Sequence, residues 1–301
     1  MTMRLLQGPL SSNGFTLEDS PDRLGWLVPS DPTGSIEVLW EQYKSQGYLW
    51  LKGLLDREAV LAFRRFYFTA FQSTGLLKPG TDPVEGIYSN GEVDQIAAHK
   101  IAVEAVRWPE FEQFCLSEPI VKFYEAFFGG DIYLHKRKII RHTKPADPNC
   151  TGGHYDLIYL RAGTDRLCSS WIPLGDTPVE MGGLIYLEGS DALGRKLEAE
   201  FSAKNGNLSP EERISAYNQN MKTGWISEDL PSLAHMVNGR WLMADYEAGD
   251  MVIHSPYTIH ASTVNHDPRN RLRLSTDIRF QRLDDKIDPR WINDWSPDDK
   301  L

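Results

Sequence analysis

Six of the eight histidines fall into two clusters, and one cluster includes a histidine and an aspartate that are two residues apart. The clusters are His135, His142 and His154 near the chain centre, and His254, His260 and His266 late in the chain. On an extended segment, residues i and i+2 point the same way, so the side chains of His154 and Asp156 could reach one point. A second histidine from a distant strand would complete a face of two imidazoles and one carboxylate. Such a face leaves about three positions of an octahedral metal open, enough for an oxidant and a chelating co-substrate.

An isolated His-x-Asp pair is weak evidence, because both side chains could equally hydrogen-bond the backbone of a loop. The late cluster shifts the balance towards a metal site. Residues 250–254 and 258–263 read as two strands, and Arg271 follows on the next strand. If neighbouring antiparallel strands carry His260 and Arg271, the guanidinium lies one ligand-length behind the metal. There it could bind the far carboxylate of a dicarboxylic acid bidentately.

The elements that must position these side chains change in kind along the chain. In the first half, we expect a helix at 36–43, a strand at 48–51, a helix from Asp56 to Gly75 and a helix from Ser117 to Gly129. Asp and Ser are common residues at helix starts, and Gly commonly ends a helix. After residue 131 the pattern favours short strands at 133–142, 167–174, 184–187, 249–254, 257–264 and 271–281. Short strands separated by Gly, Pro and Asp are typical of an antiparallel sandwich or barrel.

Helices first and strands afterwards predict an α+β fold with one jelly-roll core rather than an alternating α/β fold. We expect a single domain over residues 1–301. It would comprise an irregular arm at 1–35, a mainly helical flank at 36–130, a jelly-roll core at 131–282 and a tail at 283–301. A helical insert at about 191–240, with a helix start at Ser209–Glu212, would interrupt the strands and lie over one mouth of the barrel.

Composition excludes several classes of function. The formal net charge of −10 disfavours binding to nucleic acid or to anionic membranes. No apolar run approaches the roughly 20 residues of a membrane-spanning helix, and the first ten residues do not read as a secretory signal. The three cysteines, Cys115, Cys150 and Cys168, are odd in number and show no CxxC spacing, which favours the reducing cytoplasm. Motifs of phosphate-binding loops, zinc proteases and serine hydrolases are absent from the sequence.

Several motifs taken together resemble one enzyme family. They are His154-x-Asp156, the strand with Trp171, the run from Glu180 to Ser190 (EMGGLxxLxGS), and His260-Ala-Ser262-x-x-Asn265 followed by Arg271. This set resembles the phytanoyl-CoA dioxygenase (PhyH) family over roughly residues 40–282. The resemblance implies a double-stranded β-helix and an oxygenase that depends on iron(II) and 2-oxoglutarate.

The resemblance also implies a role for individual residues. His154, Asp156 and His260 would bind iron, and Arg271, with the hydroxyl of Ser262, would hold the distal carboxylate of 2-oxoglutarate. Residues that match positions lining the co-substrate pocket are Trp171, Tyr155 and, with a one-residue gap in the match, Lys100. The family often has Gln where this chain has Tyr155, and the insert between Ser190 and Trp241 is unusually long. Both differences concern the substrate rather than the metal centre.

Some residues admit two interpretations. His254 could rival His260 as the distal ligand, but only His260 precedes the Ala-Ser-x-x-Asn run, so we expect His254 behind the ligands or in the core. The basic strand that contains Arg137 and Arg141 could be a solvated face. Alternatively, one of these arginines points into the barrel and binds an acidic or phosphorylated substrate. Period two places five residues of the last strand on one face, where the final two could form a salt-bridge ladder: Arg271, Arg273, Ser275, Asp277 and Arg279.

The function that the resemblance implies is oxidation, most often hydroxylation, of a small organic metabolite with release of succinate and carbon dioxide. It would use Fe(II), 2-oxoglutarate and O2, with ascorbate helpful in vitro. The carboxylate of Asp156 favours hydroxylation, desaturation or ring closure over chlorination, because the related halogenating enzymes lack it. Two other classes stay open: a jelly-roll binding module without a redox metal, and a cupin-like isomerase or hydrolase with Zn²⁺ or Mn²⁺. Arg271 with Ser262 has no evident purpose in either.

Overall fold

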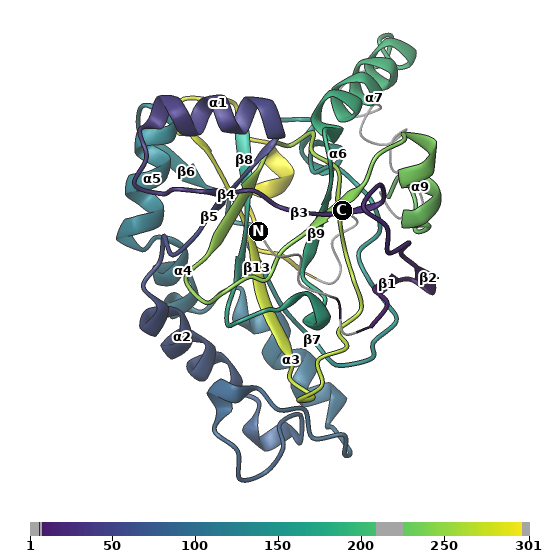
Figure 1. Ribbon diagram of the computed structural model, residues 1–301. Coiled ribbons are helices and arrows are strands. Elements are labelled where there is room, and N and C mark those ends of the chain that lie inside the picture. The colour runs from purple at the N-terminus through teal and green to yellow at the C-terminus, as the bar shows by residue number, and fades with distance from the viewer. Residues whose placement is uncertain (1–5, 7, 209–224, 297–301) are drawn as a thin grey trace.

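Two β-sheets packed face to face form the centre of the computed structural model, which describes residues 6, 8–208 and 225–296 (Figure 1). The larger sheet has the order β4-β5-β11-β8-β13-β6, and β7 pairs with the other end of β13. Its strands are β4 Pro29–Ser30, β5 Tyr48–Leu51, β6 Ile132–Leu134, β7 Ile139–Thr143, β8 Leu167–Pro173, β11 Met251–His254 and β13 Arg273–Arg282. The smaller sheet has the order β12-β9-β10-β3. Its strands are β3 Leu24–Trp26, β9 Leu184–Leu187, β10 Trp241–Met243 and β12 His260–Ser262.

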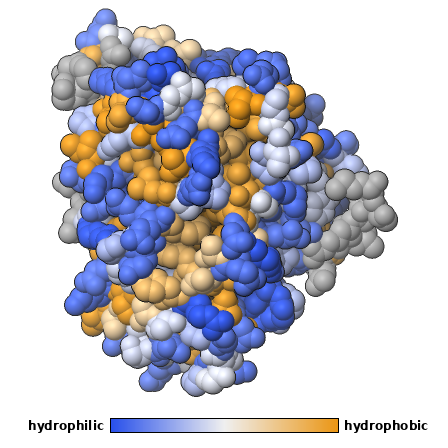
Figure 2. Space-filling model, turned by 90° about the vertical axis from the view of Figure 1, so that its left-hand side faces the viewer, coloured by the Kyte–Doolittle hydropathy of each residue, from blue (hydrophilic) through white to orange (hydrophobic). Residues whose placement is uncertain are grey.

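Helices cover the outer face of the larger sheet. They are α1 Ile36–Gln46, α2 Arg57–Thr69, α3 Gln95–Ala105, α4 Pro109–Cys115 and α5 Glu118–Phe128. Their aromatic side chains share one core with Leu274, Ile278 and Phe280 of β13. On the face that these helices form, apolar side chains show between polar ones (Figure 2). None of the described helices is long and apolar enough to cross a bilayer.

The smaller sheet is covered by α6 Leu157–Leu160, α7 Ser190–Lys204 and α9 Leu230–Met236, whose apolar residues pack with those of β9, β10 and β12. The remaining elements are the hairpin β1 Ser11–Ser12 and β2 Phe15–Thr16, and the 3-10 turns η1 Gln72–Thr74, η2 Pro83–Glu85, η3 Val179–Met181 and η4 Pro289–Trp291. Between the two sheets, Trp171 and Val252 of the larger sheet pack on Tyr186 and Tyr246 from the other side. This inner space is where the polar face of β13 points.

The alternation of side chains along β13 determines which of its residues point between the sheets. Leu274, Ile278 and Phe280 point outwards into the helix layer, so the odd-numbered residues from Arg273 to Gln281 point inwards, between the sheets. A strand of ten residues therefore carries arginines, an aspartate and a serine into the centre of the protein. Such buried charges need partners, and their partners identify the site.

The prediction of an α+β fold with a jelly-roll core is confirmed. Strands β5 and β9 and the start and end of α5 are as predicted, with Asp56 and Ser117 at the starts of their helices. The predicted strand at 133–142 is instead two strands, because the chain leaves the sheet between Leu134 and Ile139.

The N-terminal arm is also more regular than predicted, since β3 and β4 pair in parallel with β10 and β5. In the insert, α7 and α9 are helical as expected, whereas the expected helix start at 209–212 lies outside the described residues. The single-domain organisation stays a prediction.

Candidate metal centre

Two histidines of the centre are held side by side by backbone pairing. The amide of His154 donates to the carbonyl of His260 (3.1 Å), and the amide of His260 donates to the carbonyl of His154 (2.9 Å). Asp156 follows at the start of α6 with φ −70° and ψ −29°, a helical rather than an extended conformation. His154 lies in the extended bridge to His260, and the chain turns into α6 only at Asp156, two residues later. The side chains of His154 and Asp156 point to one place.

The ligand atoms of His154, Asp156 and His260 all lie within 4.8 Å of one another. Nε2 of His154 is 3.6 Å and Nε2 of His260 is 3.7 Å from Oδ1 of Asp156. The three residues are buried, with at most 7 % of their surface exposed. Two imidazoles and one carboxylate with open positions are a donor set that suits iron(II).

Hydrogen bonds fix both imidazoles for metal binding. Nδ1 of His154 donates to the carbonyl of Gly152 (2.9 Å), and Nδ1 of His260 donates to that of Thr258 (3.0 Å). A carbonyl can only accept, so each ring carries its proton on Nδ1 and presents the lone pair of Nε2 to the centre. Burial, followed by the neighbouring His154 and His254, lowers the pKa of His260 well below its ordinary value, which keeps the imidazole neutral.

The carboxylate of Asp156 has one free oxygen. Oδ1, which faces the two histidines, has no hydrogen-bond partner in the described chain, although it is buried. Burial works to raise the pKa of Asp156, but the charge of Arg279 and the contacts with His154 and His254 hold it well below the usual value. A buried, ionised oxygen without a donor is incomplete, and a metal cation at this point completes it.

Arg271, predicted to bind the co-substrate, is already paired. Its Nε and Nη2 donate to the two oxygens of Asp267 at 3.0 and 2.6 Å, a bidentate ion pair. Arg273, two residues on, points between the sheets, and its Nη2 donates to the Thr143 hydroxyl (3.0 Å). Nε and Nη1 of Arg273 are buried without a partner in the described part of the chain. Burial, and then the charge of Arg141, lowers the pKa of Arg273 to about 10.

Comparison with known proteins decides the family. The model of the phytanoyl-CoA dioxygenase (PhyH) family matches residues 43–272, well over half of the chain. The chain belongs to this family. Among curated proteins, the 1-deoxypentalenic acid 11-beta-hydroxylases of Streptomyces arenae and Streptomyces exfoliatus are 26 % and 25 % identical over 253 residues. Each match covers 81 % of this chain and 81 % of the relative. The protein is a non-haem iron- and 2-oxoglutarate-dependent oxygenase.

Solved structures show the same fold at low identity. The epimerase SnoN in complex with Fe³⁺, alpha ketoglutarate and nogalamycin RO superposes with a TM-score of 0.56 at 17 % identity, covering 88 % of this chain and 93 % of that one. The carbocyclase SnoK gives 0.55 at 19 % identity, with 87 % and 90 % covered. EctD from S. alaskensis gives 0.54 at 11 % identity, with 94 % and 91 % covered. The PhyH fold therefore extends over nearly the whole described chain.

The other site residues predicted from the PhyH resemblance differ in where they lie relative to the three ligands. Trp171 lies on the inner face of β8, with its ring 4.7 Å from that of Tyr246. The hydroxyl of Ser262 accepts a hydrogen bond from the amide of Thr151 (2.9 Å). Tyr155 points away from its two neighbours to α7, where its hydroxyl donates to Glu198 (3.0 Å). Lys100 is exposed on α3, in the outer helix layer. The structure brings neither Tyr155 nor Lys100 to the three ligands.

The two arginines of the basic segment differ in burial. Arg137 is buried, and its guanidinium lies 5.4 Å from the ring centroid of Trp291. Burial, and then the charge of Arg279, lowers the pKa of Arg137 to about 10. Arg141 on β7 is half-exposed, with Nη2 at 4.0 Å from Asp277 of β13. The interpretation as a wholly solvated basic face is thus wrong for Arg137.

Sequence reasoning missed the residues that surround Asp156. Arg279 had been placed on the correct face of its strand, but nothing in the pattern indicated which carboxylate it would reach. Ser169 gave no signal at all. His254 lies behind the ligands, as expected, with Nδ1 at 3.0 Å from the hydroxyl of Tyr186 and Nε2 at 3.5 Å from Asp156.

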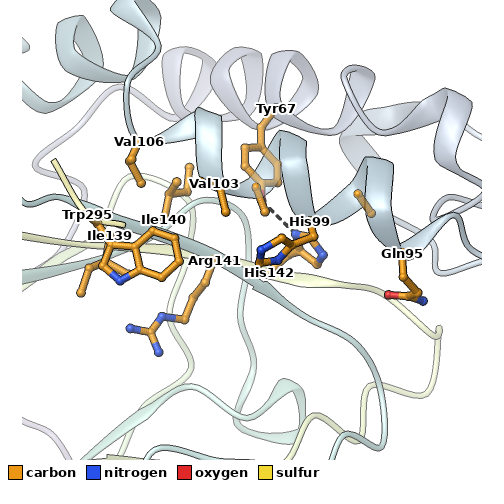
Figure 3. Close-up of a pocket in the computed structure, with 12 residues that line it drawn as sticks. Tyr67, Gln95, His99, Val103, Val106, Ile139, Ile140, Arg141, His142 and Trp295 are labelled. Carbon is orange, nitrogen blue, oxygen red and sulfur yellow. Dashed lines mark hydrogen bonds between the residues drawn. The ribbon is translucent and has the colours of Figure 1, made fainter. Parts of the chain in front are cut away.

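A separate cleft of about 520 Å³ opens between α3 and β7 (Figure 3). Tyr67 and His142, joined by a hydrogen bond of 2.8 Å, lie on its inner side. Arg141 points away from both of them, towards the space between the sheets. This cleft therefore belongs to the helix layer and not to the metal centre.

Proposed function

We propose that this enzyme hydroxylates a small carboxylic acid, with iron(II) held by His154, Asp156 and His260. The observation that carries the proposal is the free Oδ1 of Asp156, which faces two histidine nitrogens whose rings are already fixed by backbone carbonyls. The iron, when bound, supplies dioxygen activation coupled to the oxidation of 2-oxoglutarate to succinate and carbon dioxide. The chain itself supplies a fixed ligand face and a water-poor space between two sheets.

We assign the distal carboxylate of 2-oxoglutarate to Arg273 rather than to Arg271. The Nε–Nη2 edge of Arg271 is bound by the carboxylate of Asp267, which also balances its charge, whereas Arg273 has two buried nitrogens without an acceptor among the described residues. A planar guanidinium binds a carboxylate bidentately through two N–H groups on one edge, and Nη1 together with the second N–H of Nη2 offers such an edge in Arg273. The Ser262 hydroxyl accepts from Thr151 and can still donate its own proton to the same carboxylate. Trp171 would form a wall of this pocket.

The carboxylic-acid character of the substrate is supported by the charges near the centre. Arg137 and Arg141 lie in the segment opposite β13, and the pKa of Arg137 is lowered by burial and by nearby cations, so an anion there is favourable. The matched hydroxylases of Streptomyces are named for an acid, 1-deoxypentalenic acid. Arg137 and Arg141 would bind the substrate carboxylate and turn its hydrocarbon part towards the metal.

The cellular setting follows from the cysteines and the charge. All three cysteines are free thiols, and burial raises the pKa of Cys115 and Cys168. Unreactive, unpaired thiols suit the reducing cytoplasm. The net charge of −10 argues against nucleic acid or an anionic membrane as a partner.

The test is succinate release with Fe(II), ascorbate, 2-oxoglutarate and a panel of cyclic carboxylic acids. We expect wild type to form succinate and hydroxylated product, and His154→Ala to form neither. Equal succinate from both proteins would overturn the proposal. Product formed without oxygen would support instead the isomerase or hydrolase that the sequence left open.

A further inference from the structure

Asp156 presents its two oxygens to different surroundings. Oδ1 faces His154 and His260 and has no hydrogen-bond partner in the part of the chain that the structure describes. Oδ2 is contacted by the hydroxyl of Ser169 and by Nη2 of Arg279, the latter at 3.0 Å. The donors are thus all on one oxygen, and the other oxygen is left for the metal.

We propose that Arg279, with Ser169 and His254, is a clamp that holds Oδ2 of Asp156 so that the carboxylate binds the metal through Oδ1 alone. This inference rests on the proposed iron site. A carboxylate that is free to rotate can bind a metal through both oxygens and then fills one more coordination position. By keeping Oδ2 occupied, the clamp reserves that position for 2-oxoglutarate and oxygen.

Arg279 is dedicated to this contact. Its side chain is buried, its Nε and Nη1 have no partner in the described chain, and Asp156 is the only carboxylate within ion-pair distance of it there. The guanidinium lies over the ring of Trp291, 4.6 Å from the ring centroid. Trp291 in turn donates through its indole nitrogen to the carbonyl of Tyr159 (2.9 Å). The C-terminal segment therefore positions the arginine that positions the ligand.

His254 completes the clamp from the neighbouring strand β11. Its Nδ1 lies 3.0 Å from the Tyr186 hydroxyl, and its Nε2, which has no hydrogen-bond partner among the described residues, lies 3.5 Å from Oδ2. With the Tyr186 hydroxyl donating to Nδ1, the ring proton sits on Nε2 and points at Oδ2. Ser169 and His254 are paired across β8 and β11, and Ser169 and Arg279 across β8 and β13, so three adjacent strands supply the clamp at one level.

The experiment compares Arg279→Gln, Arg279→Lys and the matched control Arg290→Gln. Arg290 also pairs with a buried aspartate, Asp288, and lies beside Trp291, but it has no contact with Asp156. For each purified protein, Co(II) binding is titrated by visible absorption in the absence of 2-oxoglutarate, and 2-oxoglutarate binding to the metal-loaded protein is then titrated without oxygen.

We expect Arg279→Gln to bind Co(II) within about threefold of wild type, because a repelling cation is lost together with the fixed geometry. Its Co(II) spectrum changes as Oδ2 joins the metal, and its affinity for 2-oxoglutarate falls about tenfold. Arg279→Lys recovers part of the loss, Ser169→Ala shows a smaller change in the same direction, and Arg290→Gln matches wild type.

Two results would overturn the clamp. One is parallel loss of Co(II) and 2-oxoglutarate binding in Arg279→Gln, which indicates a merely structural residue. The other is a wild-type spectrum and affinity in that variant. Failure of the proposed function is distinguishable, because wild type itself would then bind no metal at the three ligands.

Discussion

The inner face of β13 carries a buried arginine near each end, and the two arginines differ in their partners. Arg273 and Arg279 are both buried, and in each the Nε and Nη1 atoms have no hydrogen-bond partner among the described residues. Arg279 contacts the carboxylate of Asp156, whereas Arg273 donates to the Thr143 hydroxyl and lies near a second cation, Arg141. The charge of a buried cation is compensated by a neighbouring anion, whereas a buried cation without an anion is unfavourable until an anionic ligand binds it. The difference separates the end of β13 that contacts Asp156 from the end that we propose binds the co-substrate.

The largest expected effect comes from Asp156→Ala at the metal end. The substitution removes a ligand and leaves Arg279 without its carboxylate. Outer partners of metal ligands typically contribute 10–100-fold, so loss of a ligand should lower the rate of succinate formation by more than about 100-fold. The rate is measured with saturating Fe(II), and circular dichroism checks the fold. A rate of succinate formation within about threefold of wild type would contradict the assignment of Asp156 as a metal ligand.

At the co-substrate end, Arg273→Gln should raise the KM for 2-oxoglutarate by roughly 100-fold, the equivalent of about 3 kcal/mol for charged hydrogen bonds to a carboxylate. Arg271→Gln is the matched control from the same stretch of chain, and its KM should stay within about threefold of wild type. Steady-state succinate assays at varied 2-oxoglutarate measure both. A larger rise in KM for Arg271→Gln than for Arg273→Gln would instead assign the distal carboxylate of 2-oxoglutarate to Arg271, as the sequence analysis expects.

Arg271→Gln should destabilise the protein more than Arg273→Gln does, which is the reverse of their expected order in KM. Arg271→Gln leaves the buried carboxylate of Asp267 without its cation and should lower the free energy of unfolding by about 2 kcal/mol. Arg273→Gln removes a buried cation that has no anion and should leave the ligand-free protein as stable as wild type or more so. Urea unfolding near pH 7 measures both, and equal destabilisation would show that the two sites do not differ.

The stability difference should also depend on pH. Burial works to raise the pKa of Asp267, but its bonds with Arg271 hold it below the ordinary value. An aspartate whose pKa is lowered on folding contributes stability above its unfolded pKa of about 3.9 and loses it as the pH falls. Wild type and Arg271→Gln should therefore converge in unfolding free energy below about pH 4.

The smallest effect concerns the substrate. Arg137→Gln and Arg141→Gln should each raise the KM for an acidic substrate about tenfold, because one charged contact of about 1.4 kcal/mol is lost. The KM for 2-oxoglutarate should not change, since Arg273 is intact. Assays with an acid and its methyl ester make the comparison, and the ester should be insensitive to both substitutions. An equal loss with the ester would separate these arginines from the substrate carboxylate.

The sequence motifs selected His154, Asp156 and His260, which the structure brings together, because few residue types bind metal ions. Local signals predicted β5, β9 and α5 because those signals determine where these elements begin and end. Strands β3 and β10, three residues each, carry no such signal and depend on pairing between distant segments. Arg271 and Arg273 share one face of a strand under period two, so the pattern could not choose between them. The two arginines differ because the carboxylate of Asp267, four residues before Arg271, forms an ion pair with Arg271.

The most direct test of the account is an anaerobic titration of the Fe(II)-loaded protein with 2-oxoglutarate, followed by the visible charge-transfer absorption of the chelate. Wild type and Arg271→Gln should develop the band at similar 2-oxoglutarate concentrations, Arg273→Gln should require about 100-fold more, and His260→Ala should show none. A band in His260→Ala, or one lost in Arg271→Gln and unchanged in Arg273→Gln, would contradict the account.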